Sequence, residues 1–194
     1  MKKRNIVVII VIAAIIAIWS TNAYNSLVSA EEGVEAQWAQ VENVYQRRAD
    51  LIPNLVNTVK GYADFEQQTL TKVVEARAKA TSINVDPTHI SQEGIARFQA
   101  AQEQLSGALS RLLVTIEKYP ELKANQNFLE LQAQLEGTEN RITVERNKFN
   151  EKARSYNTSI RRFPKKIFAN LFDFERKGYF KAKEGSEEPP TVTF

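Results

Sequence analysis

The chain has 194 residues, enough for one helical domain to bury its own core, and it contains one histidine and no cysteine. These counts exclude disulfide frameworks, thiolate metal sites, cysteine nucleophiles and sites built on paired histidines. The formal net charge of +3 at pH 7 resides in Lys2, Lys3 and Arg4, so the remaining chain is neutral overall, lacks the cationic excess that nucleic-acid binding requires, and is expected to have no nucleic-acid partner.

Residues 6–24 are predicted to form a transmembrane anchor helix after a short basic cytoplasmic N-terminus, residues 1–5. No charged residue occurs between Arg4 and Glu31, and the apolar run approaches the ~20 residues that cross a hydrocarbon layer of ~30 Å as a helix. Its last aromatic residues fall where aromatic belts lie, at the outer membrane interface. The residues assigned to the membrane anchor are Ile6, Ile10, Ile15, Trp19 and Tyr24.

The flanking charges predict the orientation of this helix. Three cations precede it, whereas the next basic residue is Arg47, so the N-terminus is expected in the cytoplasm and the domain in the periplasm or outside the cell. The chain is then expected to cross the membrane once. A cleaved signal peptide ending near Thr21-Asn22-Ala23 is the alternative, whereas a buried core helix is disfavoured because the run has no polar face.

Residues 25–163 show helical periodicity. In the first helix, Leu27, Val34 and Val41 recur every seven residues and Trp38 and Tyr45 follow at an offset of four. The polar residues that fall on the same stripe are Glu31 and Arg48.

The segment Asp50-Leu51-Ile52-Pro53-Asn54 interrupts this pattern. Proline disfavours helical geometry in the residue before it and removes a backbone donor, so Pro53 is interpreted either as a tight turn or as a kink. A second helical segment is predicted from about Pro53 to Ala80. Residues 82–90 form a loop around Asp86-Pro87.

Two further helices follow. The third has residues of the buried stripe at every third or fourth position, namely Ile95, Phe98, Gln102, Leu105, Leu109, Leu112 and Ile116. The fourth repeats one heptad position six times, at Phe128, Leu135, Ile142, Phe149, Tyr156 and Phe163. The predicted fold is therefore all-α, with one N-terminal transmembrane helix and an antiparallel up-and-down bundle of about four long helical segments.

The C-terminal part combines aromatic and basic residues. Residues 164–183 are predicted to be an amphipathic segment that lies on anionic headgroups as a second membrane contact. This contact requires that four helices alternate in direction and return the chain to the bilayer, which they do if Pro53 is a true turn. The alternative is that the aromatic residues only cap the open end of the bundle. The candidate interfacial residues are Lys165, Lys166, Phe168, Leu171, Phe172, Arg176 and Lys177. Residues 184–194 are expected to be a disordered tail.

A dense polar cluster occurs near the predicted helix seam. One interpretation is that Arg48 and Glu139 pair across helices and define their register. The functional interpretation is that Gly137 allows a partner to approach while nearby arginines bind a carboxylate or phosphate. The candidate interaction cluster is Arg47, Arg48, Gly137, Glu139 and Arg141.

Several motifs in this order resemble the LemA family of bacterial membrane proteins: YNSLVSAEEGVEAQWAQVENVYQRRADLIPNLVNTVKGYADFEQQTLTKVVEARAKA, LSGALSRLL, KYPELKANQNFLELQAQLEGTENRI and FNEKARSYNTSIRRFP. The resemblance covers about Tyr24 to Phe180. It implies an uncleaved N-terminal membrane helix, a LemA-like helical bundle over residues 25–163 and no established enzymatic activity.

No residue set predicts catalysis, a cofactor or a metal. His89 is interpreted as a solvated loop residue, and Glu66, Glu75, Glu136 and Glu145 either form a carboxylate metal site or, at least as readily, line a solvated face. The expected function is non-enzymatic: a scaffold or adaptor in the cell envelope that contacts membrane lipid through its first helix and binds protein partners or further copies of itself. The alternative is a binding protein for a small ligand or envelope component held between the helices.

Overall fold

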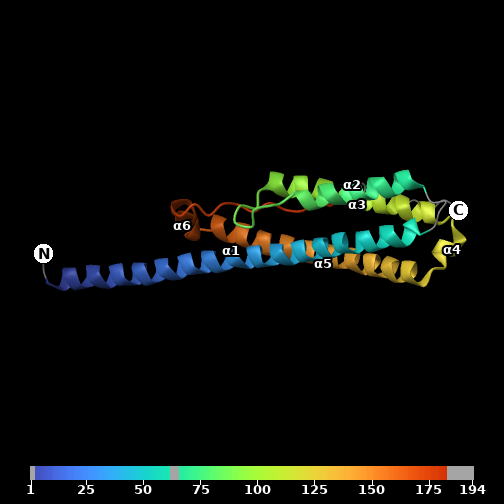
Figure 1. Cartoon of the computed structure of the whole chain (residues 1–194). Helices are drawn as coiled ribbons and strands as arrows, with labels where there is room; N and C mark the ends of the chain where they lie inside the picture. The colour runs from blue at the N-terminus through green and yellow to red at the C-terminus, as the bar shows by residue number, and fades with distance from the viewer. Residues whose placement is uncertain (1–2, 62–65, 183–194) are drawn as a thin grey trace, which may run out of the picture.

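A computed structural model describes residues 3–61 and 66–182, and every regular element in these ranges is a helix. The helices are α1 (Lys3–Lys60), α2 (Gln67–Ser82), α3 (Gln92–Ile116), α4 (Pro120–Lys123), α5 (Gln126–Arg161) and α6 (Lys165–Leu171). Four of them are long, as the sequence predicts, while α4 is a single turn between α3 and α5 (Figure 1).

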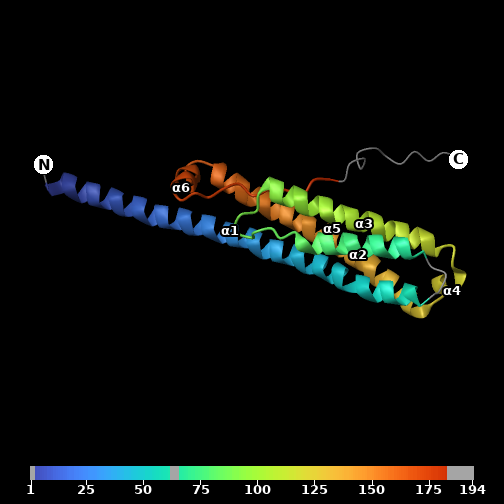
Figure 2. The same ribbon diagram turned by 45° about the horizontal axis from the view of Figure 1, so that its top comes forward.

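The four long helices alternate in direction along one bundle. α1 packs mainly on α5 and α2 mainly on α3, so the bundle consists of two helix pairs (Figures 1 and 2). The N-terminal part of α1 projects beyond the other helices. We call the end from which it projects the proximal end, and the end that holds α4 the distal end.

The core consists of a proximal and a distal apolar cluster. On α1 the first ends at Tyr45 and the second begins at Ile52, and between them lies Arg48, only 2% exposed. Gln102 of α3 and Glu139 of α5 bond to this arginine. A polar layer, defined here by Arg48, Gln102 and Glu139, therefore separates the two apolar clusters.

The predicted apolar stripes are buried, with one exception. Trp38 on α1 and Phe149 on α5 are fully buried at their centres, and their rings contact each other edge to face at 5.4 Å. Phe163 was expected to continue the stripe of the fourth helix. That expectation is wrong, because α5 ends at Arg161 and Phe163 is 82% exposed.

Pro53 neither turns the chain nor starts a new helix, so the second helical segment predicted from Pro53 to Ala80 is corrected: α1 continues to Lys60 and α2 begins at Gln67. A proline within a helix frees the carbonyl four residues before it. Here that carbonyl belongs to Ala49, and it accepts a hydrogen bond of 2.7 Å from Nε of Arg77 on α2. The neighbouring helix thus satisfies the backbone group that Pro53 leaves unpaired.

The C-terminal part differs from the predicted amphipathic segment 164–183. Only Lys165–Leu171 is helical, after which Asp173 adopts a positive φ of 54°. Residues 174–182 then run without helical structure back along the bundle (Figure 2). We call these residues the strap. The expected disordered tail, residues 184–194, lies outside the described residues.

Candidate membrane-interface site

The projecting part of α1 carries the predicted anchor residues on its surface. Ile6, Ile10 and Ile15 are 43%, 61% and 61% exposed, and Trp19 and Tyr24 are 41% and 38% exposed. Such a continuous apolar surface is unusual for a helix that water surrounds on all sides. By length and composition, α1 is long and apolar enough to cross a membrane.

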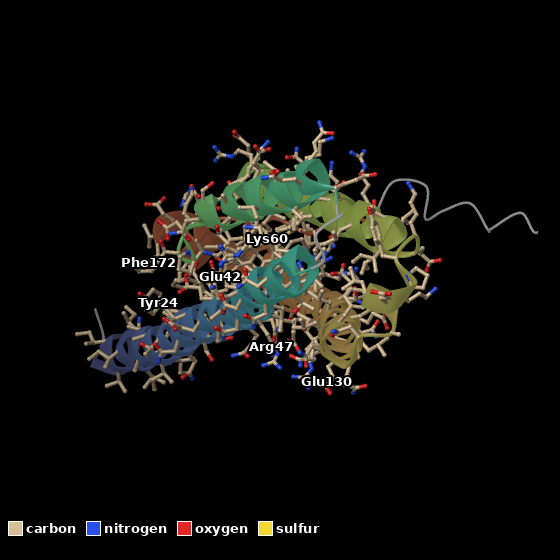
Figure 3. The ribbon with its side chains drawn as sticks, turned by 45° about the vertical axis from the view of Figure 1, so that its right-hand side comes forward. Tyr24, Glu42, Arg47, Lys60, Glu130 and Phe172 are labelled. Atoms are coloured by element: carbon tan, nitrogen blue, oxygen red, sulfur yellow. The ribbon has the colours of Figure 1, made fainter. Side chains whose placement is uncertain are left out.

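α6 lies against α1 where this apolar segment ends. The ring of Phe168 meets that of Trp19 edge to face at 5.5 Å. Phe172, just after α6, contacts the ring of Tyr24 at 4.8 Å in the same manner, and Figure 3 shows these two residues close together at the proximal end. Because the four long helices alternate in direction, the chain returns to the level of Tyr24 after α5. The first reversal lies between α1 and α2, and not at Pro53.

The two sides of α6 differ in exposure. Ala169 is buried and Phe168 half-buried against the proximal core, whereas Ile167 and Leu171 are 56% and 68% exposed. A spacing of four residues puts the latter two on one face of the helix. Thus part of α6 caps the bundle, as one interpretation predicts, and an apolar face remains open, as the other requires.

One predicted interfacial residue is placed differently. Lys177 is 5% exposed, and its Nζ lies 2.7 Å from the Glu31 carboxylate and donates to the carbonyl of Thr88 at 2.8 Å. Its assignment to a membrane contact is therefore wrong. The reason is the reversal of the chain after α6, which lays the strap along the bundle and buries Lys177, although its neighbour Arg176 remains exposed.

Tyr156 of α5 completes this buried ion pair. Its hydroxyl donates to Glu31 at 3.3 Å, and Nζ of Lys177 lies 5.7 Å from the centre of its ring. Burial, reinforced by the charge of Glu31, raises the pKa of Tyr156 well above its usual range. The phenol therefore stays protonated and acts as a hydrogen-bond donor.

The polar layer brings together only part of the predicted interaction cluster. Arg48 donates to Glu139 at 2.7 Å, as the register interpretation predicts, and also to the side chains of Ser106 at 2.9 Å and Gln102 at 2.7 Å. The other three members of the predicted cluster are exposed: Arg47, Gly137 and Arg141. A methyl group added at Gly137 would meet nothing within 4 Å, so no part of the described chain uses that glycine for a close approach.

Two open grooves of about 370 and 340 Å³ flank the polar layer. Tyr45 lines both, and burial is the main cause that raises its pKa. The grooves give a location to the alternative function, a small ligand between the helices. That function stays a prediction.

The strap is a feature that sequence reasoning missed. Side-chain amides of α3 and α5 each bond both backbone groups of one strap residue: Asn157 those of Lys177, Gln92 those of Tyr179, Asn150 those of Phe180 and Gln99 those of Lys181.

Phe180 anchors the strap in the proximal core. Its ring stacks on Trp38 at 5.8 Å and meets the edge of Phe149 at 5.6 Å, while Arg146 lies over it at 4.7 Å. The only sequence signal for the strap is the set of Asn and Gln residues on α3 and α5 that bond to it. In the sequence, these residues look like ordinary solvent-facing positions of a helix.

The predicted loop histidine is exposed, with Nε2 3.2 Å from the Glu175 carboxylate of the strap. Glu75 lies on α2, Glu66 just before it, and Glu136 and Glu145 on α5. Within residues 3–61 and 66–182 no three acidic, histidine or cysteine side chains are grouped as metal ligands.

Comparison with known proteins identifies relatives over most of the chain. Magnetosome protein MamQ of Magnetospirillum gryphiswaldense is 25% identical over 183 residues, which cover 86% of this chain and 67% of the relative. Protein LemA of Metamycoplasma hominis is 25% identical over 160 residues, 82% of this chain and 69% of the relative. The family profile described as "LemA family" matches residues 37–194, and the chain therefore belongs to the LemA family.

Proposed function

We propose that this protein is a non-enzymatic scaffold or adaptor of the bacterial envelope, which holds a rigid helical bundle at the membrane surface. Residues 6–24 cross the bilayer with the N-terminus in the cytoplasm. The outer face of α6 rests on the headgroups as a second contact. The observation that carries the proposal is the docking of α6 on α1 at Trp19 and Tyr24, where the exposed apolar segment ends.

The charges at the proximal end support this second contact. Arg161, Arg162, Lys165 and Lys166 lie in or beside the connection between α5 and α6, and none of them forms an ion pair with a described acidic residue. Unpaired cations beside exposed apolar side chains favour contact with an anionic membrane surface.

The buried charges favour a structural role over a catalytic one. Arg48 and Lys177 are each paired with a carboxylate at 2.7 Å and hold elements of the bundle together. Charged residues in such networks define helix register, as a polar position does in a coiled coil. The bundle then presents its outer surface, above the bilayer, to protein partners or to a second copy of the chain.

Single cysteines introduced into this cysteine-free chain test the second contact. Leu171→Cys on α6 and Val114→Cys near the distal end of α3 form a matched pair, since the two native side chains are 68% and 69% exposed. Each full-length variant is labelled with an environment-sensitive dye in anionic liposomes. We expect blue-shifted emission and quenching by lipid-borne nitroxides at position 171 alone. The same emission at both positions contradicts the contact.

The other parts of the proposal have their own tests. A membrane-impermeant maleimide should label Val114→Cys in spheroplasts, and labelling only after lysis contradicts the orientation.

Crosslinking in intact membranes followed by mass spectrometry should link the bundle to another protein or another copy. Links confined to one chain count against the scaffold role.

A further inference from the structure

A pocket of about 400 Å³ lies between α1 and the connection from α5 to α6. Its walls come from three sequence regions that meet because α6 docks on α1. Its lining includes Trp19, Ser26, Ser159, Arg162, Phe163 and Lys165.

The pocket is cationic. Arg162 and Lys165 line it and no acidic side chain does. Nζ of the half-buried Lys165 donates to the neutral hydroxyl of Ser26 at 2.7 Å and has no carboxylate partner among the described residues. In contrast, Arg48 and Lys177, which are the buried cations among the described residues, are each neutralised by a glutamate. An ammonium group and a guanidinium group that form no ion pair with a described carboxylate are suited to bind an anion.

The position of the pocket selects the kind of anion. Trp19, which ends the exposed apolar run of α1, forms one wall, and the 82% exposed Phe163 contributes a second apolar surface. A ligand that enters from the membrane therefore meets cations and hydroxyls at headgroup level and apolar side chains below them. A free phosphate would contact only the cations and hydroxyls, whereas a phospholipid contacts these groups and the apolar side chains as well.

We propose that this pocket binds the phosphate group of one anionic phospholipid, and the proposal rests on the membrane anchoring proposed above. Arg162 and Lys165 contact the phosphate, while the hydroxyls of Ser26 and Ser159 bind its oxygens or the headgroup. The acyl chains run along the exposed apolar residues of α1 below Trp19. The site ties α6 to α1 through a lipid as well as through direct aromatic contacts.

Native mass spectrometry of the full-length protein in detergent tests this site with phosphatidylglycerol and phosphatidylcholine as probes. Both lipids carry a phosphate, but phosphatidylcholine also carries a quaternary ammonium group that Arg162 and Lys165 repel. We therefore expect one phosphatidylglycerol to be retained with a preference of at least about tenfold. The double variant Arg162→Gln with Lys165→Gln should lose the preference. Lys152→Gln with Arg154→Gln removes the same charge from exposed positions of α5 outside the pocket and should retain it.

Each outcome separates the alternatives. Equal loss in both double variants means unspecific charge attraction and overturns the site. Displacement of the lipid by inorganic phosphate at millimolar concentration overturns a phospholipid ligand in favour of a free anion. Protein that stays in carbonate-washed membranes but shows no preference refutes this inference alone, whereas protein released by carbonate refutes the anchoring itself. Unchanged circular dichroism melting of both variants verifies their fold.

Discussion

At the scale of single residues, the unusual groups are the buried charges. The Arg48 side chain is 3% exposed, while its partner Glu139 is 55% exposed on the surface of α5. The two sides of the ion pair are therefore not equivalent. Removal of Arg48 lets the glutamate return to water, whereas removal of Glu139 leaves a buried guanidinium with only neutral partners.

This asymmetry predicts the result of a double-mutant cycle. Glu139→Ala should lower the free energy of unfolding by about 2–4 kcal/mol, because an unpaired buried charge is strongly destabilising. In an Arg48→Met background the same change should alter it by less than about 0.5 kcal/mol, as for an ordinary exposed residue. Urea unfolding of the full chain in detergent, followed by circular dichroism, measures both. Equal losses in the two backgrounds would mean that the pair contributes nothing.

A second residue-scale prediction concerns pH. Burial raises the pKa of Glu42, so the fold favours its protonated form. Its contribution to stability is therefore lost as the pH rises from the usual carboxyl pKa through the raised one. Glu42→Gln should increase the melting temperature at pH 7 relative to wild type, with a smaller effect at pH 4.

Glu145 provides a control of opposite sign. Hydrogen bonds from Lys148 and then Gln37 lower the pKa of its carboxyl, which stabilises the fold at pH values above the usual carboxyl pKa. Glu145→Gln should therefore lower the melting temperature at pH 7 and change it less at pH 3. Changes of the same sign in the two variants would show that loss of net charge, and not the local environment, determines the effect.

At the scale of elements, the strap depends on one close backbone approach. A methyl group at Gly178 would lie 2.7 Å from Cα and 2.8 Å from N of Gln92. The backbone of the strap or of α3 must therefore move, and Gly178→Ala should lower the free energy of unfolding by roughly 1–3 kcal/mol. Chemical unfolding of the full chain provides the measurement.

Gly137→Ala is the matched control for this substitution. Gly137 lies within α5 with open space around it, so alanine there should raise stability by about 0.5–1 kcal/mol through helix propensity. A Gly178→Ala protein as stable as wild type would show that the strap is not packed on α3 as described.

The elements also show where sequence reasoning succeeds. The buried stripes of α1 and α5, centred on Trp38 and Phe149, follow from local helical periodicity, so they were predicted correctly except at Phe163. The end of the first helix was misplaced because Pro53 was interpreted as the break, whereas α1 ends at Lys60, directly before Gly61. The signal at Gly61 agrees with helix C-terminal chemistry, whereas the effect of Pro53 is offset by Arg77, a contact between residues distant in sequence.

The candidate site was predicted only in part, for the same physical reason. Phe168 and Phe180 both belong to an aromatic and basic composition, yet one lies at the proximal end beside Trp19 and the other inside the core. What separates them is the chain reversal at Asp173 and the amides on distant helices that bond the strap. The composition of a segment depends only on neighbouring residues, whereas these contacts join residues that are distant in sequence.

At the scale of the whole molecule, α1 is one uninterrupted helix from the apolar segment to the distal end. α6 packs against it on the bundle side of the apolar segment, and the contact at Tyr24 opposes bending there. If residues 6–24 span the bilayer, residues 25–60 extend about 54 Å beyond it at ~1.5 Å per residue. A typical helix tilt of ~20° shortens this height only slightly.

This geometry predicts that the bundle stands upright on the membrane. A donor dye at Val114→Cys, near the distal end of α3, should lie about 50 Å from acceptor-labelled lipid headgroups in proteoliposomes, whereas a donor at Leu171→Cys should lie at the surface. Energy transfer as a function of acceptor density gives both heights. A height near 20 Å for position 114 would mean that α1 bends beyond Tyr24 and that the bundle lies along the bilayer. Continuity of α1 and the packing of α6 on it are the reasons to expect the larger value, because a bend there would require breaking the Tyr24 and Phe172 ring contact.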